Sequence, residues 1–272
     1  MPRRFHGPPQ TRPKTTPAPK SYREAEAMLG HIQTFNPKIF DGDATCSTDL
    51  CNLVLALAVI HNDINGIELA FALRNTQGPF EEKKISAERG LAGGIGLQLA
   101  KLRLAVIHEL LILLQKSGSA LKDSYLDRML AQMHETNRSA WRTIVKAAME
   151  QDDATTLSRA LCACRDKVSF HYDRKSIASA FRERFANNAE PPCISVGDSI
   201  ASTRFYFGDA AVEYHLQNRG TSPARVHDIV FGADPILATI DHALSSMVIV
   251  FIKRRSKELG FEISLVAEMS KS

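Results

Sequence analysis

Hydrophobic positions recur mostly at intervals of three and four from residue 21 onward, which is the spacing of amphipathic helices. The repeat is clearest between Leu50 and Leu73, where only the polar cluster His61-Asn62-Asp63 interrupts it. A run that is apolar on nearly all sides predicts a central helix over about 95–116. Between them, a proline, a charged run and several glycines predict a loop over 76–94. The pattern as a whole predicts an all-α fold, a helical bundle.

The second half of the chain continues the helical pattern. A narrow apolar stripe runs from Leu121 to Met133, a short helix is expected around Trp141, and a further helix is expected to begin near Asp153 or Thr155. Asp173 has the character of an N-cap for a helix that carries Ile177, Phe181 and Phe185. Residues 200–217 suit a hairpin and a helix equally well. The last helix is expected to begin at Asp234-Pro235 and to end at Gly260.

Residues 1–21 differ from the rest in composition. They contain six of the twelve prolines and five basic residues but no acidic residue, so we expect a disordered tail. Because these five cations exceed the net charge of +4, the remainder carries a net charge of −1. Overall charge therefore does not argue for nucleic-acid binding, although a local basic patch stays open. Without an internal repeat or a long linker, residues 22–272 are expected to form a single all-helical domain.

Several classes of protein and site are not expected. The longest apolar stretches, at 53–60 and 244–252, fall short of the roughly 18 residues of a membrane span. Five unpatterned cysteines without a signal peptide indicate reduced thiols in the cytoplasm. Cys162 and Cys164 lack a second ligand pair at zinc spacing, so no metal is expected. No strand precedes the glycines at 90–96 and no Gly-Lys-Ser/Thr follows them, so no nucleotide cofactor is expected.

The stretch RDKVSFHYD is the strongest candidate for chemistry. His171 can exchange a proton near neutral pH, and Arg165 can hold phosphoryl oxygens as charge builds on them. Together they can cleave RNA without a metal, by activating the 2′-hydroxyl and leaving a 2′,3′-cyclic phosphate. On a straight helix, however, the two side chains point about 120° apart and lie roughly 9 Å apart along the axis. They can share a phosphate only if the helix ends near Phe170 or a second subunit completes the site.

The alternative for this stretch is structural: a surface arginine beside a histidine that caps the carbonyls of a helix end. A second Arg…His pair, Arg103 and His108, lies in the middle of a strongly apolar helix. For that pair we expect a buried polar pair or the lining of a cavity.

Arg165, the polar Asp166 and His171, followed by Tyr172-Asp173 in an all-α domain, resemble the signature of the HEPN superfamily. The resemblance implies a metal-independent endoribonuclease that works as a homodimer, with two copies of the motif facing one cleft. It further implies Arg165 and His171 as the catalytic pair, Asp166 as the residue that orients them, and RNA as the substrate. Asp166 stands where the family often has Asn or His. Members occur in toxin–antitoxin and antiviral defence systems, so a cognate antitoxin or another partner protein is an expected partner.

The cluster around His61 has two interpretations. It either lines the same cleft as His171 or forms an internal hydrogen-bond network, because buried polar groups need partners. His61 and Asn62, with Tyr172, are the candidate binding residues. Two other functions stay open from the sequence: a non-catalytic helical dimer that binds a partner protein or nucleic acid, and a helical bundle that binds a small molecule around His61, Asp63 and His108.

Overall fold

The computed structural model describes residues 33–75, 87–149, 173–186, 192–196, 204–218 and 235–265. These residues form an all-α protein, as the apolar spacing predicts. The elements, in chain order, are β1 (Gln33–Thr34), the 3₁₀ helix η1 (Pro37–Phe40), α2 (Thr48–Asn75), α3 (Ala87–Lys116), α4 (Gly118–Leu121), α5 (Ser124–Leu130), α6 (Glu135–Met149), α8 (Arg174–Ala186), α9 (Tyr206–Asn218), α11 (Pro235–Glu258) and β2 (Ser264–Leu265).

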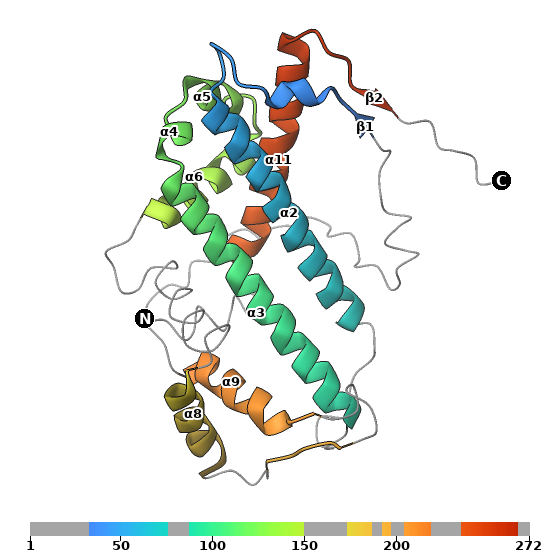
Figure 1. Cartoon of the computed structure of the whole chain (residues 1–272), viewed down its shortest axis with the longest axis vertical. Helices are drawn as coiled ribbons and strands as arrows, with labels where there is room; N and C mark the ends of the chain where they lie inside the picture. Colours follow the sequence, from blue (N-terminus) through green and yellow to red (C-terminus); the bar gives the residue numbers. More distant parts are fainter. Residues whose placement is uncertain are drawn as a thin grey trace, which may run out of the picture.

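Three long helices organise the molecule (Figure 1). α2 packs against α3 and α11, while α6 packs between α11 and α3. The short helices α4 and α5 cover one end of this bundle. At the other end α8 and α9 form a pair, and α9 packs against α3. The two-residue strands β1 and β2 pair antiparallel, with Gln33 opposite Leu265 and Thr34 opposite Ser264.

The core lies where α2, α3, α6 and α11 meet. It consists mainly of leucine and isoleucine side chains, and burial of each contributes about 1.5–3 kcal/mol of transfer free energy. Trp141 of α6 is the largest fully buried side chain, and Tyr125 and Phe251 are also fully buried. The central position expected of the helix over 95–116 is confirmed by five α3 residues with at most 1 % exposure: Leu104, Ile107, Leu110, Leu111 and Leu114.

One buried cation fixes the end of the bundle formed by η1, α4, α5 and the C-terminal half of α11. Arg255 of α11 is 1 % exposed. Its guanidinium lies 3.0 Å from Oδ2 of Asp43 and donates to the carbonyl oxygens of Ile39 and Asp41 at 3.3 and 3.1 Å. α11 then ends as predicted, because Gly260 adopts a φ of +70°. We call this region the Arg255 end.

The predicted loop over 76–94 is wrong for its last part, because α3 begins at Ala87. Glycines are poor helix formers, yet here two of them allow close approach of other side chains. A Cβ on Gly90 would collide with the ring of Tyr206, and one on Gly94 with the guanidinium of Arg204. Contacts with Arg204 and with Tyr206, the first residue of α9, therefore favour glycine at these two positions of α3.

Other boundaries follow the sequence more closely. The helix around Trp141 is confirmed as α6, and the last helix begins at Pro235 as predicted. Most of the ambiguous segment 200–217 is helical, as α9. The stripe from Leu121 to Met133 is divided, with α4 ending at Leu121 and α5 capped by Asp123, whose side chain accepts from the Tyr125 amide. The tail 1–21 and the helix expected from Asp153 lie outside the described residues.

α2 also has the length and apolar composition of a helix that can cross a membrane, over Thr48–Arg74. The core helix of a soluble protein passes the same test. In α2 the side chains of Leu50, Val54 and Leu57 are fully buried in the bundle. Length and composition alone therefore do not show that α2 spans a membrane.

Candidate functional site

The RDKVSFHYD stretch is described from its last residue onward. Arg165, Asp166, His171 and Tyr172 lie outside the described residues, and the chain resumes at Asp173. Asp173 is not helical and caps α8: its side chain accepts from the Lys175 amide at 3.2 Å and from the Ser176 hydroxyl at 2.6 Å. The predicted N-cap is therefore confirmed. A straight helix does not run through the motif into α8, because Asp173, two residues after His171, is not helical.

His61 is positioned by residues from two helices. Its Nε2 lies 3.1 Å from Oδ1 of Asp241 on α11, and the Asn65 side-chain amide donates to its Nδ1 at 3.2 Å. With Nδ1 as the acceptor, Nε2 carries the proton and donates to Asp241. The hydrogen bond from His61 lowers the pKa of the Asp241 carboxyl, and this outweighs the opposing effect of its burial. The chain Asn65–His61–Asp241 joins α2 to α11.

The rest of the polar cluster on α2 faces elsewhere. Asn62 and Asp63 are exposed, so the structure does not bring Asn62 into the hydrogen-bond chain of His61. His108 on α3 is 4 % exposed and lies within the bundle. Asp63 and His108 thus differ in environment, one facing solvent and one facing the core. This placement does not favour a single ligand site built from His61, Asp63 and His108.

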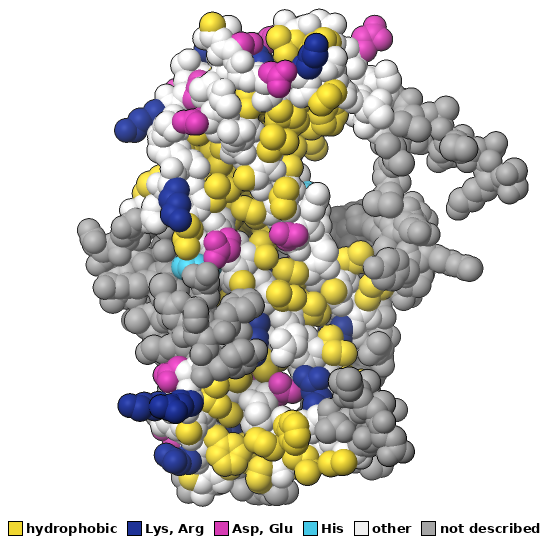
Figure 2. Space-filling model, viewed as in Figure 1, with side chains coloured by type: hydrophobic (Ala, Val, Ile, Leu, Met, Phe, Trp, Pro, Cys, Tyr) yellow, Lys and Arg dark blue, Asp and Glu magenta, His cyan; other side chains and the backbone are white. Residues whose placement is uncertain are grey.

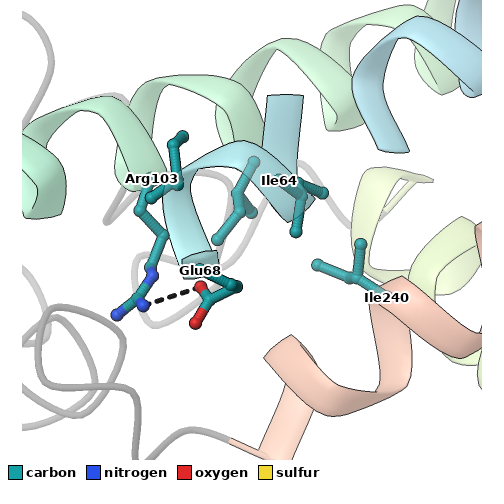
Figure 3. A pocket seen from close by; sticks show the side chains of 6 residues that line it. Ile64, Glu68, Arg103 and Ile240 are labelled. Atoms are coloured by element: carbon teal, nitrogen blue, oxygen red, sulfur yellow. Dashed lines mark ion pairs between the residues drawn. The ribbon is translucent and has the colours of Figure 1, made fainter. Parts of the chain in front are cut away.

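A small cavity lies between α2, α3 and α11 (Figure 3). Nη2 of Arg103 lies 2.6 Å from Oε1 of Glu68, and its guanidinium lies 4.0 Å from the ring centre of Phe71. The cavity has a volume of about 10 Å³, which is roughly the room of one water molecule. Ligand pockets usually span about 300–1,000 Å³. The apolar lining consists of Ile64, Ile67, Ile107 and Ile240.

Arg103 therefore belongs to an ion pair at the edge of this cavity. Its side chain is 4 % exposed while that of Glu68 is 45 % exposed, so the carboxylate neutralises a buried guanidinium. This placement matches the expectation of a buried polar residue that lines a cavity. Among the described residues, no cluster of three or more His, Cys, Asp or Glu side chains is arranged to hold a metal ion.

Sequence reasoning missed the partners in both pairs. The sequence pairs Arg103 only with His108, and no local signal links Arg103 to Glu68. No local signal identifies Asp241 as the partner of His61, because 180 positions separate them along the chain. The local charge of +3 on α8 was also not predicted from the sequence. It comes from four basic residues against one acidic residue in RKSIASAFRERFA. Its signal in the sequence is the excess of basic over acidic residues within this one helix.

No family model, curated protein or solved structure matches the chain.

Proposed function

We propose that the protein is a metal-independent endoribonuclease of the HEPN type that acts as a cytoplasmic homodimer in a toxin–antitoxin or antiviral system. The observation that carries the proposal is that Asp173, two residues after His171, is not helical and caps α8. It supports the condition under which Arg165 and His171 can share a phosphate, because the motif does not continue into α8 as one straight helix. The all-α fold is the second support.

The proposed chemistry needs only the side chains of the motif. A neutral His171 accepts the proton of the 2′-hydroxyl, and the 2′-oxygen attacks the neighbouring phosphorus. The bond from phosphorus to the 5′-oxygen breaks, which leaves a 2′,3′-cyclic phosphate on one product. The other product is a 5′-hydroxyl, and the histidine of the second motif in the dimer supplies its proton. Arg165 holds the non-bridging oxygens as negative charge builds on them, and Asp166 orients the arginine.

The test is cleavage of RNA by the purified full-length protein in EDTA, compared with His171→Ala and Arg165→Ala. Loss of a general base or of a transition-state contact is expected to slow cleavage by about 10²- to 10⁴-fold. His242→Ala is the matched control, because His242 is an exposed histidine on α11. It is expected to cleave at the rate of the unaltered protein.

Two results would contradict the proposal. Equal cleavage by the unaltered protein and by His171→Ala would show that the motif takes no part in the cleavage. Absence of cleavage in every variant and on every RNA tried would leave a non-catalytic protein that binds a partner or nucleic acid. Product ends add a second criterion, since a 3′-hydroxyl product would exclude attack by the 2′-oxygen.

A further inference from the structure

The α8–α9 end, comprising Arg174–Ala186, 192–196 and 204–218, carries a continuous row of four phenylalanine rings. Ring centres of Phe185 and Phe181 are 5.0 Å apart, those of Phe181 and Phe207 are 5.8 Å apart, and those of Phe207 and Phe205 are 5.9 Å apart. Three of these rings are half-buried between α8 and α9. Phe205, at the end of the row, is 58 % exposed. The row therefore begins with half-buried rings packed between α8 and α9, and it ends with an exposed ring at the surface.

Two more apolar side chains lie beside Phe205. Ser195 and Arg204 form an antiparallel bridge, and each donates its amide to the carbonyl of the other at 2.9 Å. Side chains alternate along extended backbone, so Ile194 and Val196 share the face of Phe205, opposite Ser195 and Arg204. They are 56 % and 77 % exposed. The other face is used by Tyr206 and Arg204, which reach Gly90 and Gly94 of α3.

α8 contributes basic side chains to the same end of the molecule. Lys175 and Arg182 are exposed and seven positions apart, which places them on one face of α8. Arg184 lies 5.6 Å from the ring centre of Phe185. Four acidic residues lie at or beside this end: Asp173 caps α8, Asp209 pairs with Arg204 at 2.8 Å, and Glu183 and Glu213 have exposed side chains. Figure 2 shows hydrophobic and basic side chains together at this end of the molecule.

We propose that the α8–α9 end is a binding surface for single-stranded RNA. Unpaired bases would stack on Phe205 beside Ile194 and Val196, and phosphates would lie along Lys175 and Arg182. Exposed rings beside cations are the combination by which proteins hold single strands, because every base offers a π-face. An acidic protein segment would use the cations but gain little from a bare phenylalanine ring.

The choice of RNA rests on the proposed ribonuclease function, which this surface would serve by capturing substrate. Its position fits that use, since Asp173, the cap of α8, is two residues from His171. A strand held along α8 would lead toward the motif. The charge is local: the chain beyond the first twenty residues is close to neutral, whereas α8 carries +3, against the two acidic residues of α9, Asp209 and Glu213.

The experiment measures binding of a fluorescently labelled oligouridylate to the full-length protein carrying His171→Ala, in EDTA, so that cleavage does not interfere. Adding Phe205→Ala is expected to weaken binding about tenfold through loss of one stacked base. Adding Lys175→Ala with Arg182→Ala is expected to reduce the slope of log K against log salt by about 0.7 for each cation removed. Phe35→Ala and Lys253→Ala are the matched controls, because both side chains are exposed and lie outside the α8–α9 end. They are expected to bind as the parent does.

Unchanged binding in Phe205→Ala and in the α8 variant would overturn the surface, and so would absence of binding in the parent. Displacement of the oligonucleotide by polyglutamate at matched charge, with no effect of Phe205→Ala, would assign the surface to an acidic protein instead. The two proposals fail separately. Binding that depends on Phe205 without any cleavage refutes the ribonuclease alone. Cleavage that depends on His171 with binding that ignores Phe205 and α8 refutes the surface alone.

Discussion

The Arg255 end and the α8–α9 end both combine arginine with aromatic rings, but they use them in opposite ways. At the Arg255 end, Phe40 stacks on Phe251 at 5.1 Å, and the guanidinium of Arg255 lies 5.7 Å from the ring centre of Tyr125. Both Arg255 and Tyr125 are fully buried. At the α8–α9 end the ring row ends at the exposed Phe205, and Lys175 and Arg182 of α8 are also exposed.

The difference follows from what surrounds each cation. Arg255 is buried, and it contacts the exposed carboxylate of Asp43, two backbone carbonyls and an aromatic ring, so the cost of removing its charge from water is offset within the fold. Exposed cations on α8 have kept their hydration and contribute little to stability. Similar residue types thus stabilise the fold at one end and are available to a ligand at the other.

The largest expected contrast between core and surface is in the free energy of unfolding that is lost when a side chain is truncated to alanine. Leu111→Ala, which empties a fully buried position in α3, is expected to lower the free energy of unfolding by about 3 kcal/mol. Phe205→Ala removes a side chain that is mostly in solvent and is expected to change it by less than about 0.5 kcal/mol. Urea unfolding followed by circular dichroism measures both. A loss of several kcal/mol in Phe205→Ala would mean that this ring is structural.

The next contrast concerns charge. Arg255→Met removes a buried guanidinium and leaves two carbonyls and Asp43 without their donor, so we expect a loss of about 2 kcal/mol. Lys257→Met, two positions along the same helix and exposed, is the matched control and is expected to be close to neutral. Equal effects of the two substitutions in urea unfolding would refute a stabilising role for the buried cation.

Acid is expected to destabilise the Arg255 end through protonation of Asp43. Hydrogen bonds from the Thr45 hydroxyl and amide, with one from Arg255, hold the pKa of Asp43 well below its usual range. A carboxyl with a lowered pKa contributes stability above its unfolded pKa of about 3.9, and this contribution is lost as the pH falls below that value. We therefore expect the free energy of unfolding to decline below about pH 4, and to decline less steeply in Asp43→Asn. Asp127→Asn, at an exposed position on α5, is the control. The same decline in both variants would contradict this assignment.

The smallest expected effect is at His61. Its pair with Asp241 is partly exposed, at 19 % and 37 %, so His61→Ala should cost less than about 1 kcal/mol. A double-mutant cycle with Asp241→Asn isolates the coupling, which we expect near 0.5 kcal/mol. His242→Ala, next to Asp241 but exposed, serves as the control. Coupling indistinguishable from zero would show that the pair does not join α2 to α11 in solution.

The sequence was informative where a local rule decides the structure. Asp173 caps α8, Pro235 begins α11 and Gly260 ends it, because capping and turn preferences act within a few residues. It failed where a distant contact decides. Gly90 and Gly94 predicted a loop, yet they lie in α3. Glycine fits at these two positions because the side chains of Tyr206 and Arg204 occupy the space that a Cβ would need. The pairs of Arg103 with Glu68 and of Arg255 with Asp43 likewise depend on helix packing that no local pattern encodes.

The division between the two ends is tested most directly by hydrogen exchange of the His171→Ala protein, with and without a saturating oligouridylate. We predict slower amide exchange within 173–186, 192–196 and 204–218, and no change within 118–149 or 251–265. Protection centred on the Arg255 end, with the α8–α9 end unchanged, would contradict the account.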